Sequence, residues 1–60
     1  MFTKGDIVEW HGEQFKVAAV SSQAVLIDNT NQPPDDDGTY RCFRLPATDA
    51  THELKKVSAA

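Results

Sequence analysis

The chain has very little that could cross-link it or carry it across a membrane. Cys42 is the single cysteine among 60 residues, so no internal disulfide can form. Cys42, His11 and His52 do not follow the spacing of zinc-finger ligands, and we expect neither a metal site nor a cofactor. No apolar run approaches the roughly 20 residues of a membrane helix, and the first residues lack the apolar stretch of a secretory signal. These absences predict a cytoplasmic protein with no membrane partner.

Positive charge is also scarce. Six Lys and Arg stand against nine Asp and Glu, which gives a formal net charge of −3. Nucleic-acid binders usually present a basic face, so this acidic balance disfavours nucleic acid as the partner without excluding a local basic patch. We interpret the cations as solubilising surface charge, with Lys55 and Lys56 forming an adjacent pair near the end of the chain.

Sixty residues are enough for one small domain, predicted to span residues 1–60. A domain of this size buries only about 60% of the surface that its unfolded chain exposes, so many such domains depend on a disulfide, a metal or self-association. Because a disulfide and a metal site are both disfavoured, the domain is expected to be stabilised either by an economical hydrophobic core or by burial against a partner. A homo-oligomer is therefore left open.

Short apolar stretches separated by turn residues predict an all-β fold. Four strands are expected, at residues 7–10, 14–20, 24–28 and 40–45. His11 and Gly12 fit the two central positions of a tight hairpin turn. Val20 breaks the alternation of the second strand, which predicts a β-bulge near residues 18–19.

The side chains expected to point inward together are Val8, Val17, Leu26 and Phe43. Cys42 is expected to be buried and inert within the fourth strand.

Residues 47–57 allow two interpretations. In the first, Thr48 or Asp49 caps a short helix, with Lys55 and Lys56 near its end. In the second, a tight turn follows Pro46 and residues 53–57 form a fifth strand that closes a barrel. We favour the strand, with a short helical turn near residues 47–53 as an accompanying feature.

The opening residues resemble a known class of small barrels. Gly5, Asp6 and Val8 form a "G-D-x-V" turn and strand followed by a hairpin, which is similar to the opening of KOW-type and Tudor-type members of the Src-homology-3-like barrels. The resemblance implies a single five-stranded barrel. The chain lacks the basic and glycine-rich residues with which KOW modules touch ribosomal RNA, and it lacks the paired aromatics of proline-peptide binders. The resemblance therefore implies a fold and no binding residues.

Candidate functional residues lie mainly in and beside a long polar segment, residues 29–39, which is expected to be an exposed loop. Its three consecutive carboxylates, Asp35, Asp36 and Asp37, are not spaced as calcium ligands and are interpreted as a solvated turn or as an acidic docking loop. Tyr40 follows the segment and is expected to be exposed. Trp10 belongs either to a core with Phe15 and Phe43 or to an open aromatic platform.

These features predict a small non-enzymatic binding module with no catalytic residues. Its partner is expected to be a protein that contacts Tyr40, Trp10 and the three aspartates. A chain this small and acidic suggests an accessory factor or inhibitor encoded by a phage or mobile element. Two alternatives remain: a nucleic-acid or ribosome-associated module, and an enzyme whose site forms only at an oligomer interface.

Overall fold

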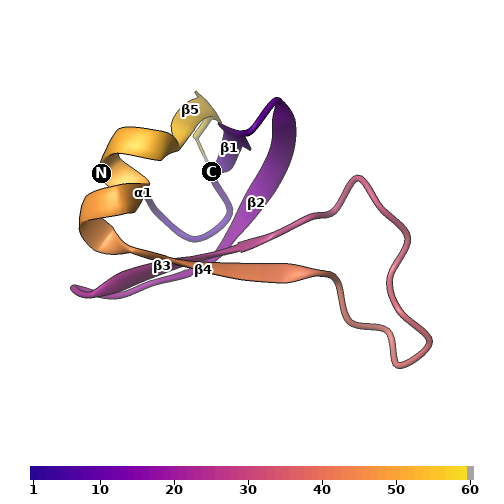
Figure 1. Ribbon diagram of the computed structural model, residues 1–60. Coiled ribbons are helices and arrows are strands. Elements are labelled where there is room, and N and C mark those ends of the chain that lie inside the picture. The colour runs from indigo at the N-terminus through magenta and orange to yellow at the C-terminus, as the bar shows by residue number, and fades with distance from the viewer. Residues whose placement is uncertain (60) are drawn as a thin grey trace.

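The structure is a computed structural model that describes residues 1–59 (Figure 1). In this part of the chain, five strands and one short helix follow one another. They are β1 (Ile7–Trp10), β2 (Glu13–Val20), β3 (Ala24–Asp28), β4 (Cys42–Pro46), α1 (Ala47–Glu53) and β5 (Lys55–Ser58).

The strands form one antiparallel sheet in the order β4-β3-β2-β1-β5. This confirms the all-β class and the five strands. A closed barrel is not shown, because within residues 1–59 no pairing joins β4 to β5. In Figure 1, β2 curves from the β1 side of the molecule to β3 and β4, and α1 lies on the same side as β1 and β5. The sheet is therefore strongly bent but retains two edges.

The first hairpin has the predicted tight turn. Trp10 pairs with Glu13, and the two residues between them have positive φ angles, 52° at His11 and 79° at Gly12. Two successive positive φ angles define the turn whose twist matches that of the flanking strands. The hairpin prediction is confirmed.

The predicted bulge in β2 is also confirmed. The register between β2 and β3 shifts between Val17 and Ala19, so that Val17 opposes Ile27 and Ala19 opposes Leu26. A bulge increases the local twist and bends the strand, which lets one strand serve both halves of a curved sheet.

Within residues 1–59, nine apolar side chains form the buried core: Val8, Phe15, Val17, Ala24, Val25, Ile27, Leu45, Ala50 and Leu54. Leu26 is only half-buried, so its predicted inward orientation is wrong. Val25 and Ile27 take the inward positions instead, because they oppose Leu45 and Phe43 across the sheet. In a run of three apolar residues, only the pairing of neighbouring strands decides which face turns inward.

The C-terminal segment, residues 47–58, contains both predicted elements, a short helix followed by a fifth strand. α1 occupies residues 47–53, and the strand begins at Lys55 rather than Glu53. Pro46, the last residue of β4, is also the N-cap of the helix, and no side-chain hydrogen bond caps it, so the predicted cap at Thr48 or Asp49 is wrong. Leu54 ends the helix with an extended backbone. No helix among the described residues has the length and apolar character of a membrane span.

The Gly5-Asp6 motif closes the N-terminal turn and ties it to β5. Gly5 has a φ of 96°, and its N–H donates to Val17 O at 2.8 Å. The carboxylate of Asp6, whose side chain is only 2% exposed, accepts the Thr3 N–H at 2.8 Å and lies 3.1 Å from Lys56 Nζ. The motif that carries the resemblance therefore has a structural role here.

Candidate binding site

The connection between β3 and β4 is the most prominent feature of the surface. Residues 30–40, which we call the arm, extend away from the sheet as a long loop (Figure 1). All of these residues are exposed, as the sequence predicted. The arm thus offers backbone and side chains to a partner without any opening of the core.

Hydrogen bonds fix the base of the arm. Asn29 is buried, its N–H donates to Arg41 O at 2.8 Å, and its side-chain oxygen accepts the Asn31 N–H at 3.1 Å. The Asn31 side chain donates to Gln14 O at 2.8 Å, which joins the arm to β2. The direction in which the arm leaves the sheet is therefore set by the sheet itself.

A second group of hydrogen bonds shapes the tip. Asp35 N–H donates to Thr39 O, and Gly38 N–H donates to Asp35 O, both at 2.8 Å. The Asp37 carboxylate accepts the Thr39 hydroxyl at 2.6 Å and the Thr39 N–H at 3.1 Å. These bonds, that of the hydroxyl first, lower the pKa of Asp37, so its charge persists at mildly acidic pH. Among residues 1–59, no hydrogen bond or ion pair engages the side chains of Asp35 and Asp36, and both residues are exposed.

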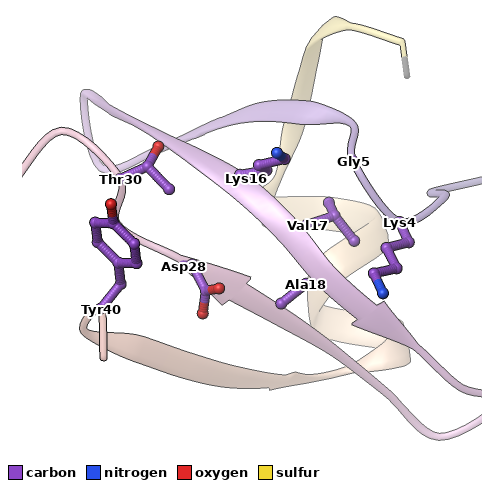
Figure 2. A pocket seen from close by; sticks show the side chains of 8 residues that line it. All are labelled: Lys4, Gly5, Lys16, Val17, Ala18, Asp28, Thr30 and Tyr40. Atoms are coloured by element: carbon purple, nitrogen blue, oxygen red, sulfur yellow. The ribbon is translucent and has the colours of Figure 1, made fainter. Parts of the chain in front are cut away.

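An open hollow of about 570 Å³ lies beside the base of the arm (Figure 2). We call it the lysine hollow. Its lining residues are Lys4, Gly5, Lys16, Val17, Ala18, Asp28, Thr30 and Tyr40. Figure 2 shows Tyr40 and Thr30 at one end, Lys4 at the other, and Lys16, Ala18 and Asp28 between them.

The fold explains how the lysine hollow acquires its charges. Lys16 and Asp28 are direct cross-strand partners on β2 and β3, and both lie on the face opposite to Val17 and Ile27. Lys4 is placed by the turn at Gly5, whereas Tyr40, 41% exposed, comes from the end of the arm. Two ammonium groups, one carboxylate and one aromatic ring from four separate segments thus line one hollow.

The predicted site residues lie in three separate places. Tyr40 lines the lysine hollow, and Asp35, Asp36 and Asp37 lie at the tip of the same arm. Trp10 is half-buried instead, with its ring centroid 5.6 Å from that of Phe15 and 5.2 Å from that of Phe43. This cluster packs against the core, which favours the core interpretation of Trp10 over the aromatic platform.

Cys42 is exposed, so its predicted burial is wrong. It opens β4, an edge strand, and its cross-strand partner is Asp28. Partial desolvation and, second, the neighbouring Asp28 carboxylate raise the pKa of the Cys42 thiol.

The two histidines lie in different elements, His11 in the turn between β1 and β2 and His52 in α1. Residues 1–59 contain no group of three or more His, Cys, Asp or Glu side chains arranged to hold a metal ion.

Comparison with protein-family models, with curated proteins and with solved structures gave no match to this chain. The function therefore has to be argued from the arm and the lysine hollow.

Sequence reasoning found Tyr40 and the aspartates but missed Lys4, Lys16 and Asp28. For Lys16 a signal existed, because alternation with Phe15 and Val17 places it on the outer face.

Proposed function

We propose that this protein is a small non-enzymatic binding module whose arm docks on a basic surface of a partner protein. The observation that carries the proposal is the form of the arm, which projects from the sheet with three consecutive carboxylates at its tip. Its position lets the acidic tip enter a concave or flat basic surface while the rest of the domain stays outside.

The hydrogen bonds at both ends of the arm support this proposal energetically. Ordering a long loop on binding costs free energy, and a loop that already holds its shape loses less of it. The base is fixed through Asn29 and Asn31, and the tip through Asp37 and Thr39. Clustered carboxylates also accelerate encounter with a basic partner, an effect that weakens as salt increases.

A nucleic-acid module remains a second candidate, favoured by one feature. Lys4, Lys16 and exposed Tyr40 combine cations with an aromatic ring, as single-strand binders do. The acidic tip of the arm and the formal net charge of −3 oppose binding to a phosphate backbone, so we rank this candidate below protein binding. A single-stranded oligonucleotide titration at low salt tests it, and a complete lack of binding there removes it.

The main test is capture of partners from the native host with matched variants. The triple variant D35N, D36N, D37N is expected to lose the partner recovered by the wild type at low salt. The control triple variant E9Q, E13Q, D49N removes the same charge from exposed positions outside the arm and is expected to retain the partner.

A third variant, in which residues 32–38 are replaced by Asn-Gly, tests the arm as a whole. It is expected to lose the same partner while still melting cooperatively. Recovery of an identical set of proteins by the wild type and both arm variants would contradict docking through the arm.

A further inference from the structure

We propose that the lysine hollow of one copy binds the tip of the arm, residues 33–37, of a second copy. The inference deepens the proposed function and rests on its premise that the arm is the binding element. It assigns the hollow an occupant of defined chemistry: a proline-containing acidic segment.

The hollow has unused positive charge. Within residues 1–59 neither Lys4 nor Lys16 forms an ion pair, whereas Lys56 is paired with Asp6. Lys16 faces Asp28 across the strands without a salt bridge among the described residues. Two ammonium groups at one apolar surface are a suitable site for two carboxylates, because pairs that exclude water interact more strongly than isolated surface charges.

The tip of the arm has the complementary features. Asp37 is engaged by Thr39, which leaves the side chains of Asp35 and Asp36 for the two lysines. The preceding Pro33 and Pro34 favour a stiff extended backbone, and such segments dock on exposed aromatic rings with little loss of entropy. Tyr40 supplies that ring at the arm end of the hollow.

The position of the hollow selects a second copy over the same copy. In a single chain the tip points away from the body, and within residues 1–59 Asp35 and Asp36 pair with neither lysine (Figure 1). Thr30 and Tyr40, at the base of the arm, line the hollow itself. Two copies related by a two-fold axis can therefore lay their arms antiparallel, each tip on the other's hollow, and the contact closes as a dimer.

Sedimentation equilibrium of the full chain tests this arrangement. We expect a monomer–dimer equilibrium whose dissociation constant rises as NaCl is raised from low to high concentration. The variant K4Q, K16Q is expected to weaken dimerisation by at least about tenfold. The control R44Q, K55Q removes the same charge from exposed positions outside the hollow and is expected to stay within about twofold of the wild type.

A charge exchange makes the test specific for the tip and the hollow. The variants K4E, K16E and D35K, D36K are each expected to be monomeric, and an equimolar mixture of the two is expected to form a heterodimer. Circular dichroism melts show that each variant is folded. A mixture that stays monomeric would overturn the pairing of tip and hollow.

Failure of this inference can be told apart from failure of the proposed function. A wild-type chain that is monomeric at low salt and high concentration overturns self-association, whereas arm-dependent capture of a different protein would still uphold docking through the arm. An oligonucleotide that binds the monomeric wild type but not K4Q, K16Q would also overturn the inference and assign the hollow to nucleic acid.

Discussion

Single glycines with positive φ angles show which turns the fold depends on. A Cβ added at Gly12 (φ 79°) or at Gly38 (φ 85°) meets no atom within 4 Å, so only the backbone conformation decides its cost. Gly12→Ala is expected to lower the free energy of unfolding by about 1–2 kcal/mol, because β1 and β2 hold the turn in place. Gly38→Ala is expected to cost less than about 0.5 kcal/mol, because the arm can relax. Urea melts measure the free energy of unfolding of both variants. Equal losses would show that the arm unfolds cooperatively with the sheet.

The buried carboxylate of Asp6 is the second residue whose loss should be costly. Asp6→Ala removes the acceptor of the Thr3 N–H and leaves Lys56 without its anion. We expect a loss of about 2 kcal/mol or more in the free energy of unfolding. Lys55→Ala, at an exposed position on the same strand, is the control and should change the stability by less than about 0.5 kcal/mol. Similar melts for both variants would show that the ion pair does not hold the N-terminus to β5.

The exposed thiol gives a prediction about pH. Partial desolvation and the Asp28 carboxylate raise the pKa of Cys42, so the folded protein binds the thiol proton more tightly than the unfolded chain does. Since only the thiolate reacts, alkylation by iodoacetamide should be slower in the folded protein than in urea at the same mildly alkaline pH. Asp28→Asn should speed alkylation of the folded protein, and Asp49→Asn should leave it unchanged. An unaltered rate in Asp28→Asn would remove Asp28 as a cause.

At the scale of elements, β3 shows where strand patterns stop being informative. The pattern correctly predicts a strand at residues 24–28, but Val25, Leu26 and Ile27 are all apolar. The choice of face follows from β4, where Leu45 and Phe43 oppose Val25 and Ile27. The position of the strand could be predicted from neighbouring residues, whereas the face that turns inward depends on the pairing with β4.

The face assignment of β3 can be measured directly. Ile27 is fully buried, and Ile27→Ala is expected to cost about 2–5 kcal/mol through lost burial and the cavity left behind. Leu26→Ala is expected to cost clearly less, because the half-buried Leu26 side chain lies on the other face. Chemical denaturation measures the free energy of unfolding of both variants. A larger loss in Leu26→Ala than in Ile27→Ala would show that Leu26 belongs to the core.

At the scale of the whole molecule, the sheet and the arm are predicted to be energetically separate. All buried core side chains lie outside the arm. Replacing residues 32–38 by Asn-Gly shortens the loop, and the smaller closure entropy should stabilise the protein by about 0.5 kcal/mol. Thermal melts of this variant and the wild type measure the change. A large loss of stability would show that the arm supports the sheet, and its role in docking would then need another test.

Features that depend on neighbours in the chain could be predicted from the residues alone: the turn at His11 and Gly12, the bulge in β2 and the exposure of the arm. That Lys4, Lys16 and Tyr40 share one hollow, and that Lys56 pairs with Asp6, became visible only in the folded chain. Local conformation follows from alternation and turn residues over a few positions. The meeting of distant side chains depends instead on which strands pair and in which register, and residue spacing alone does not encode that choice.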